Sequence, residues 1–297
     1  MSSAVDVEPA AHAPAEPVRV SLLVRGVTGG WPARVGLASI VVMFLIAFVG
    51  PFVAPNDPTE IVAVPFAPPG NGLPLGADFL GRDALSRFLH GGAIVVIVAL
   101  LATGLAYLVG ISLGLLVGLV RGPADVATLG VADVLVAFPP VILVLMLVAG
   151  AGSSITVAIV AISLVHLPRI VRIVRSVTRE VAAREYVEAA VANGERTSYI
   201  LRREILPNIW TPVMADFGLR VTGSMLVYAS LSFLGLGQDP PASNWGLMIS
   251  ENRIGLLKQP SVVLAPAIAI AVLAIGFNLV ADGIARSVGR STDRPDG

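Results

Sequence analysis

The sequence predicts an all-α membrane protein with six transmembrane helices, cytoplasmic N- and C-termini and a cytoplasmic loop made of two helices. Three observations lead to this prediction. Of the 297 residues, 55% are hydrophobic and 13% are charged, a balance typical of membrane proteins. Six apolar runs are long enough to cross a bilayer. Between two of them, residues 179–207 hold five Arg and five Glu, too many charges for a segment inside a bilayer.

The six predicted spans follow a short tail. Residues 1–18 are rich in Ala and Pro and have no hydrophobic periodicity, so we expect a disordered cytoplasmic tail. The first apolar run starts too late and is too long for a cleaved signal peptide. We therefore expect a transmembrane domain over residues 19–297. Its spans are placed near residues 35–54, 93–119, 127–150, 154–175, 208–236 and 261–284.

Positive charges orient these spans. With the N-terminus in the cytoplasm, fifteen basic residues lie on the cytoplasmic side, and one more, Arg220, lies within a span. Four remain outside: Arg82, Arg87, Arg253 and Lys258. Cytoplasmic loops carry an excess of Lys and Arg, so the opposite orientation is disfavoured. Both termini and the loop at residues 179–207 are expected in the cytoplasm.

The segment before the second span, residues 55–92, is rich in Pro and Gly and is expected outside the cell membrane. Residues 83–90 can form an amphipathic turn at the membrane interface, with Asp83 near its start. Its apolar side chains would face lipid or protein, and these are Leu85, Phe88 and Leu89.

The second span carries small residues at every fourth position, which predicts a close helix–helix contact. They are Ala102, Ala106, Gly110, Gly114 and Gly118. The same run satisfies the pattern G-x-S-x-G around Ser112, so an intramembrane serine protease with His166 as base is an alternative. Against it, a nucleophile elbow needs a strand-to-helix turn, and Ser112 lies within a predicted helix.

Two features mark the third and fourth spans. The sequence Phe138-Pro139-Pro140 predicts a kink in the middle of the third span. Asp133, earlier in that span, is a candidate partner for an Arg. In the fourth span, Arg169, Arg172 and Arg175 share one helical face, and we expect them to reach the cytoplasmic interface and anionic lipid.

The charged loop at residues 179–207 has the pattern of two short helices. Residues 182–193 combine helix-favouring Ala, Arg and Glu without Pro or Gly. Gly194 stands where a left-handed residue would end this helix. Thr197 or Ser198 can cap a second helix, which Pro207 would stop at Leu206.

The fifth span contains Asp216 and Arg220, four residues apart and therefore on one helical face. They form either an ion pair within the helix or a polar spot on a translocation path. Gly235 and Gly237 are expected to end the helix, and Trp245 is expected to anchor the chain at the outer interface.

The charged loop resembles a known motif. Glu188-Ala189-Ala190, then Gly194, then Ile205-Leu206-Pro207 are similar to the "EAA" coupling loop of permease subunits of bacterial ABC importers. The resemblance implies that this loop enters a cleft of an ATPase subunit. Glu188 and Arg196 would make polar contacts with the ATPase, Ala189 and Ala190 would allow close approach, and Gly194 would set the angle between the two helices.

Three further stretches resemble the dipeptide/oligopeptide/nickel branch of that family. They are residues 75–87, residues 231–249 and residues 277–283. The usual Thr is replaced by Ala77 and the usual Gly by Ala281, and the family's common Asp-Pro ending is missing. The resemblance implies a multi-pass inner-membrane permease that imports peptides. Its partners would be a second related permease, two ATPase subunits and an extracytoplasmic binding protein. Nickel or another small solute remains an alternative cargo.

What the sequence lacks argues against an enzyme. The single lysine, Lys258, is followed by Gln259, so no P-loop can form. There is no Cys, and the three His are scattered, which excludes the common metal motifs. We expect no cofactor on this chain, with ATP and Mg²⁺ on the partner ATPases. The zero net charge gives no indication of nucleic-acid binding. A proton-coupled secondary transporter, with Asp216 as the buried acid, is the more distant alternative.

Overall fold

The computed structural model describes residues 30–120, 122–238 and 241–292, and in these ranges every assigned element is helical. The expected tail at residues 1–18 lies outside the described residues. In chain order, the elements are α2 (Trp31–Phe48), η1 (Gly50–Val53), α3 (Ala84–Leu119), α4 (Pro123–Ala137), α5 (Pro140–Ala151), α6 (Ile155–Ala182), α7 (Glu185–Ala192), α8 (Thr197–Tyr199), η2 (Ile200–Ile205), α9 (Leu206–Phe233), α10 (Trp245–Asn252), η3 (Arg253–Gly255) and α11 (Ser261–Thr292).

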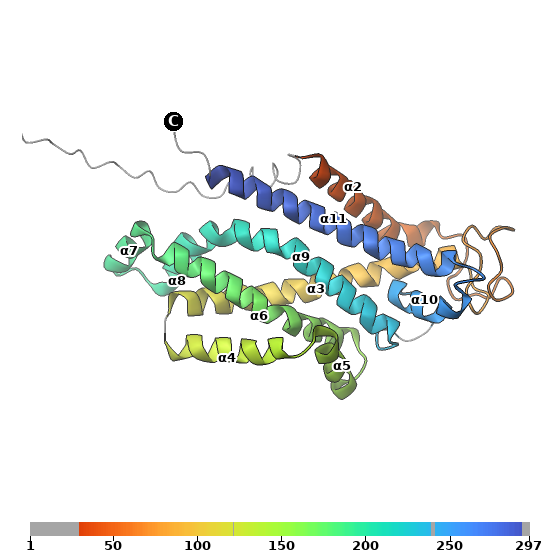
Figure 1. Ribbon diagram of the computed structural model, residues 1–297, viewed down its shortest axis with the longest axis horizontal. Helices are drawn as coiled ribbons and strands as arrows, with labels where there is room; N and C mark the ends of the chain where they lie inside the picture. The colour runs from red at the N-terminus through yellow and green to blue at the C-terminus, as the bar shows by residue number, and fades with distance from the viewer. Residues whose placement is uncertain (1–29, 121, 239–240, 293–297) are drawn as a thin grey trace, which may run out of the picture.

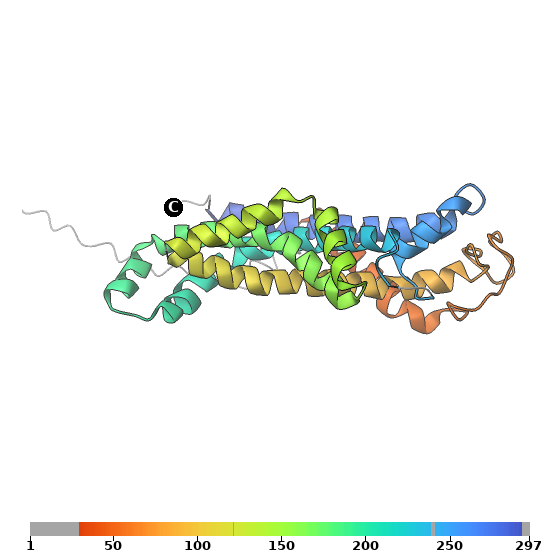
Figure 2. The ribbon, with the colours of Figure 1, turned by 90° about the horizontal axis from the view of Figure 1, so that it is seen from below.

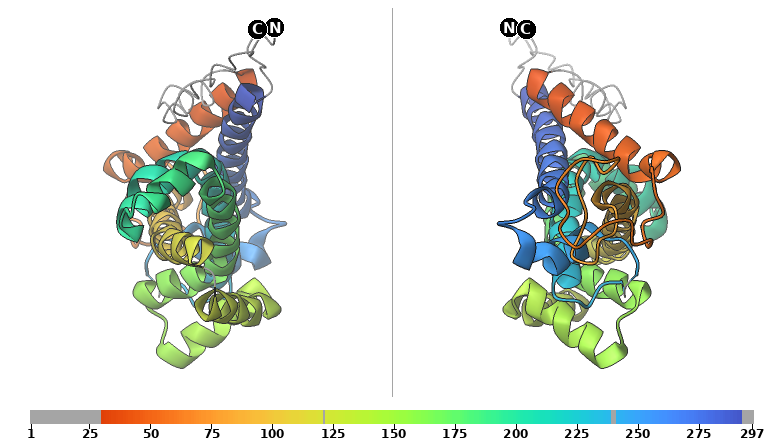
Figure 3. Two further views of the ribbon diagram at one scale, coloured as in Figure 1. Left: turned by 90° about the vertical axis from the view of Figure 1, so that its left-hand side faces the viewer. Right: turned by 90° about the vertical axis from the view of Figure 1, so that its right-hand side faces the viewer.

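The helices form an elongated bundle. Helices α3, α6, α9 and α11 run along its length, with α7 and α8 at one end and α10 at the other (Figure 1). The view turned by 90° shows the same elongated outline (Figure 2). In the end-on views, α4 and α5 lie on the opposite side of the bundle from α2 and α11 (Figure 3). The two ends of the molecule therefore carry different elements.

Four helices of the described chain are long and apolar enough to cross a membrane: α2, α3, α6 and the part of α11 up to Arg286. The pair α4 and α5 gives a fifth if it counts as one broken span. Helix α9 covers most of the expected span at 208–236 and has 28 residues. It is less apolar because Asn208, Asp216 and Arg220 interrupt its hydrophobic residues. An all-helical fold is confirmed, while six spans stay a prediction.

The third expected span is two helices rather than one. Helices α4 and α5 meet at Phe138 and Pro139 with a bend of 93°. The kink that the double proline predicts is confirmed, because neither proline can donate a backbone hydrogen bond to a continuing helix. Pro140 becomes the first residue of α5, a position where a missing N–H costs nothing. The predicted kinked span over residues 127–150 corresponds to this bent pair, and its passage across the membrane as one span stays a prediction.

Helix α3 starts earlier than expected. It begins at Ala84 instead of residue 93, and the Asp83 carboxylate caps it by accepting from the Leu85 N–H at 3.0 Å. Asp83 at the helix start is therefore confirmed. The amphipathic turn is not a separate interfacial element but the first two turns of a 36-residue helix.

The row of small residues on α3 packs against α6, as the four-residue spacing predicts. A Cβ added to Gly110 would lie 2.6 Å from Ile170 Cγ2, and one on Gly114 would lie 2.6 Å from Val174 Cβ. Gly118 meets Thr178 in the same way. Side chains larger than Gly would push the two helices apart, so these glycines set their separation.

Ser112 lies inside α3, and its hydroxyl donates to the Leu108 carbonyl at 2.8 Å. The strand-to-helix turn that a nucleophile elbow requires is therefore absent at this position. His166 packs against Gly223 of α9 instead, where an added Cβ would lie 2.9 Å from its Cε1.

Candidate functional site: the loop between α6 and α9

The charged loop contains the two helices that the sequence predicts, with shifted bounds. Helix α6 continues to Ala182, and α7 covers Glu185–Ala192 instead of residues 182–193. Gly194 follows with φ +76°, the left-handed conformation expected of it. No atom beyond its chain neighbours lies within 4 Å of where its Cβ would be. The conformation alone therefore explains why a glycine suits this position.

The second helix of the loop begins and ends differently from the prediction. Thr197 is its first residue, and its N-cap is Arg196, which makes no side-chain cap bond, so a cap by Thr197 or Ser198 was wrong. Pro207 does not stop the helix. The chain passes through the π-helical turn η2, where the Leu206 N–H bonds the Leu201 carbonyl, and continues into α9. Pro207 sits in the first turn of α9, where a proline is tolerated.

Apolar side chains fix the loop to the bundle. Val187 of α7 and Ile200 and Ile205 of η2 are at most 3% exposed. They share one hydrophobic cluster with residues of the two long helices that flank the loop. These are Ile170, Val174 and Val181 of α6 and Ile209 and Val213 of α9. Because this cluster is well buried, α7 and η2 are held to the ends of α6 and α9 as one packed unit.

The predicted coupling residues divide between surface and core. Glu188, Ala189, Gly194 and Arg196 are exposed, Ala190, Leu206 and Pro207 are half-buried, and Ile205 is fully buried. Motif residues at the surface can touch a partner, whereas Ile205 acts only through packing. Two exposed apolar side chains, Val191 and Tyr199, lie among them and had not been singled out by sequence reasoning.

The charges of the loop are mostly left to solvent. In the described part of the chain, the one ion pair that involves residues 183–204 joins Arg184 to Glu180 at 4.0 Å. The Tyr186 hydroxyl of α7 is buried and has no hydrogen-bond partner among the described residues. Burial raises the pKa of this hydroxyl above its usual value of 10.0.

A second polar cluster lies deep in the bundle. Asp216 and Arg220 of α9 form an ion pair, with 2.7 Å between Asp216 Oδ1 and Arg220 Nη2, which confirms the predicted pairing within the helix. Tyr107 of α3 donates its hydroxyl to the other Asp216 oxygen at 2.8 Å. His166 of α6 is 5% exposed, and neither ring nitrogen has a partner among the described residues. The four-residue spacing in the sequence predicts the pair within α9, but it gives no indication that Tyr107 of α3 contacts Asp216.

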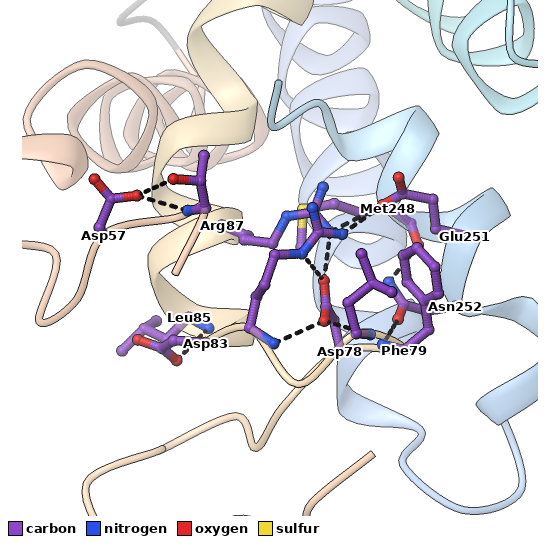
Figure 4. A network of polar contacts seen from close by, with 12 residues as sticks. Asp57, Asp78, Phe79, Asp83, Leu85, Arg87, Met248, Glu251 and Asn252 are labelled. Atoms are coloured by element: carbon purple, nitrogen blue, oxygen red, sulfur yellow. Dashed lines mark hydrogen bonds and ion pairs between the residues drawn. The ribbon is translucent and has the colours of Figure 1, made fainter. Parts of the chain in front are cut away.

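The far end of the molecule holds a buried network of charges (Figure 4). Arg87 of α3 contacts Asp78 at 2.5 Å and Glu251 of α10 at 2.9 Å. Arg82 contacts the same two carboxylates at 2.7 and 3.4 Å. The Arg87 side chain is fully buried, as is that of Asp78. The segment before α3 is thereby tied to α10.

Other buried polar contacts reinforce this end. The Asn252 side chain accepts from the Phe79 N–H at 2.9 Å (Figure 4). Trp245 is fully buried, stacks on Phe88 at 5.6 Å between ring centroids, and donates its indole N–H to the Phe88 carbonyl. Its expected role as an anchor at the membrane interface was wrong, because Gly91 and Gly92 leave room for the ring inside the bundle.

The arginines of α6 are also partnered within the chain. Arg172 pairs with Asp133, and Arg175 and Arg179 pair with Asp125 of α4. The prediction that Asp133 pairs with an Arg is confirmed. Carboxylates on the adjacent helix α4 are thus partners of Arg172 and Arg175, while contact of these arginines with anionic lipid stays a prediction.

Comparisons with known proteins agree with this architecture. Residues 110–294 match the family described as "Binding-protein-dependent transport system inner membrane component". Over 210 residues, 71% of this chain and 70% of the relative, the chain is 37% identical to a glutathione transport system permease protein of Pectobacterium atrosepticum. It is 33% identical over 257 residues to a probable D,D-dipeptide transport system permease protein of Escherichia coli, which covers 86% of each chain. A dipeptide transport system permease protein of Haemophilus influenzae is 32% identical over 259 residues, 85% of this chain and 88% of the relative.

Proposed function

Because the chain belongs to the family of inner membrane components of binding-protein-dependent transport systems, we propose that it is a permease subunit of an ATP-driven importer of di- and oligopeptides. It forms half of the translocation pathway, and a second related permease forms the other half. Two ATPase subunits bind ATP and Mg²⁺ on the cytoplasmic side, and an extracytoplasmic binding protein delivers the cargo. The similar proteins named above, which transport glutathione, D,D-dipeptides and dipeptides, support a peptide cargo.

The observation that carries this proposal is the construction of the loop between α6 and α9. Its inner face is anchored by Val187, Ile200 and Ile205, and its outer face presents Glu188 and Arg196 without partners inside the loop. A surface that packs firmly inward and leaves charges outward is suited to dock a soluble partner.

In the proposed mechanism, the ATPases close on ATP and displace α7. Because α7 and η2 are packed on α6 and α9, the displacement passes to two long helices of the bundle. Their rearrangement would alternate access to the pathway, with Asp216 and Arg220 as candidate lining residues. The ATPases can shift the permease only as far as their contacts with the loop differ between the two states.

The topology in this proposal has six spans, with α9 as the fifth and the α4–α5 pair as the third. Both termini and the loop are cytoplasmic. The positive-inside bias of the sequence supports this orientation, which also leaves the buried network at Asp78 and Arg87 on the outer side.

A substitution of Gly194 tests the proposal. Gly194→Val should abolish ATP-dependent uptake of a radiolabelled dipeptide by vesicles that hold the complete transporter, because β-branched residues disfavour the left-handed conformation. The permease and its ATPases should remain in the membrane. A matched control is Gly72→Val: Gly72 also has positive φ, +85°, and no atom within 4 Å of its Cβ position, and this variant should retain uptake.

Uptake at the normal rate by Gly194→Val would overturn the coupling role. Uptake by the unaltered protein that follows a proton gradient and resists vanadate would overturn the ATP-driven importer in favour of a secondary transporter. Competition by nickel ions, but not by dipeptides, would replace the peptide cargo.

A further inference from the structure

Ion pairs join α4 to the part of α6 that leads into the loop. Asp125, in the first turn of α4, forms an ion pair with Arg175. Arg175 Nε lies 2.5 Å from Asp125 Oδ1, and Arg175 Nη2 lies 2.8 Å from Asp125 Oδ2. Arg179 contacts the same carboxylate at 2.6 Å. Asp133 of α4 forms an ion pair with Arg172 of α6. The later carboxylate of α4 thus meets the earlier arginine of α6, so the two helices run antiparallel.

The arginines of these ion pairs lie on one face of α6, and the glycines of α3 contact a different face of α6. Arg172, Arg175 and Arg179 are three and four residues apart and so share a face. Ile170, Val174 and Thr178, which touch the glycines of α3, form a separate row at four-residue spacing. The final turns of α6 are therefore held on one side by tight apolar contact and on the other side by ionic contact with α4.

The apolar contact between α4 and the bundle is incomplete. A cavity of about 180 Å³ lies between α3, α4 and α6. Its lining residues include Leu113 of α3, Val131 and Leu135 of α4, and Leu167 of α6. Side chains around a void lose dispersion contacts and hold neighbouring helices less firmly. The ion pairs therefore add to an apolar contact between α4 and α6 that leaves space unfilled.

These pairs lie directly on the route from the loop into the membrane domain. Helix α6 is unbroken from Arg172 to Ala182, and α7 begins three residues later at Glu185. On the other side of the pairs, α4 continues through the 93° bend into α5. Of the ion pairs between α4 and α6, those of Asp125 involve the arginines closest to the end of α6 and to α7.

We propose that Asp125 is a positioning residue that makes the bent α4–α5 segment move together with α6 when the loop is displaced. This inference rests on the proposed function. Asp125 is the important carboxylate because its side chain is 10% exposed and holds two arginines, whereas Asp133 is 69% exposed and holds one. Sheltered charge-assisted bonds with two contacts are strong, while exposed ion pairs contribute little.

The experiment measures coupling in the complete transporter reconstituted with its binding protein and ATPases. Asp125→Asn should lower the number of dipeptides imported per ATP hydrolysed at least about fivefold, the lower range of measured couplings between sites. ATP hydrolysis itself should continue. Asp125→Glu should restore the ratio, and the matched control Asp133→Asn should change it by about twofold or less.

A covalent link separates a positioning role from a structural one. Because the natural chain has no Cys, Asp133→Cys and Arg172→Cys can be introduced together with Asp125→Asn and bridged by a short bis-maleimide. Bridging should restore the coupling ratio, measured per mole of folded permease, and the unbridged triple variant should stay uncoupled.

A normal ratio in Asp125→Asn would overturn the proposal, and so would an uncoupled Asp125→Asn that bridging fails to rescue. Recovery on adding anionic lipid without a bridge would also overturn it, because the arginines would then act on lipid. If the unaltered transporter itself imports without ATP, the proposed function fails instead, so the two failures are distinguishable.

Discussion

The two ends of the molecule handle charge in opposite ways. At the end with α10, Asp78, Arg82, Arg87 and Glu251 neutralise one another inside the protein. At the end with α7, acidic and basic side chains such as Glu188 and Arg196 are exposed. Both ends are rich in charged side chains. The four at the α10 end pair with one another, whereas residues 183–204 of the described chain form a single ion pair, Arg184 with Glu180.

The difference separates charges that hold a fold from charges that can recognise a partner. A buried ion without a counter-ion is costly, so burial forces Arg87 to find carboxylates within the chain. Exposed charges are hydrated and carry no such requirement. They remain available for an ATPase, and pairing across that contact would select the correct partner and orientation.

The largest effect should follow from breaking the buried network. Arg87→Met keeps most of the side-chain length but leaves the buried carboxylates of Asp78 and Glu251 with one cation. We expect the free energy of unfolding to fall by about 3–5 kcal/mol, as for other buried ion pairs that lose one partner. Unfolding of the purified permease in mixed micelles, followed by tryptophan fluorescence, measures this. A loss no larger than that of Arg196→Ala at the exposed end would contradict the comparison.

An intermediate effect should follow from removing a neutral partner at the same end. Asn252→Ala leaves the Phe79 N–H without the acceptor that it has at 2.9 Å. An unpaired buried donor costs about 1–3 kcal/mol, less than an unpaired buried charge. The same unfolding assay applies, and Asn193→Ala, on the exposed surface after α7, is the matched control. Equal effects of Asn252→Ala and Arg87→Met would mean that the network is not governed by charge.

The sequence predicted much of the exposed end and little of the buried one. Gly194 and the helix of α7 depend on local conformational preference, which a short stretch of sequence encodes. The network at Arg87 depends on Glu251, which lies 164 residues away. Long-range pairing of this kind leaves no periodic pattern in the sequence. The sequence therefore predicted only that Arg82 and Arg87 lie on the outer side of the membrane, and not which carboxylates they contact.

The errors in the bundle have the same origin. Pro139 and Pro140 predicted a kink because a proline acts on its own helix, but the 93° angle was not predicted, since α4 and α5 each pack against α6, which lies outside the sequence pattern of the kink. Trp245 was predicted at the interface from its residue type, whereas Gly91 and Gly92 of α3 admit it to the interior. Pro207 was read as a helix stop because the π-helical turn before it is not visible in local propensity.

The smallest loss of stability, and the finest test of the comparison, concerns the buried hydroxyl of Tyr186 in α7. The Tyr186 hydroxyl has no partner among the described residues, so Tyr186→Phe removes no hydrogen bond and should not lower the free energy of unfolding at pH 7, because an unpaired buried hydroxyl does not stabilise the fold. A loss above about 1 kcal/mol would show that the hydroxyl is bonded in the folded chain.

Alkaline pH should separate this variant from the unaltered protein. Burial raises the pKa of Tyr186 in the folded chain above 10.0, so above about pH 10 the unfolded chain loses its phenolic proton first. Below that pH, Tyr186 is neutral in both states and its contribution to the free energy of unfolding does not depend on pH. As the pH rises toward the pKa of Tyr186 in the folded chain, the free energy of unfolding falls. Tyr186→Phe lacks this decline, so its stability relative to the unaltered protein should increase above pH 10. Tyr199→Phe, an exposed tyrosine of the same loop, controls for the loss of a phenol. A constant difference between the unaltered protein and Tyr186→Phe across this pH range would mean that Tyr186 is solvated and that α7 is not packed on α6 and α9.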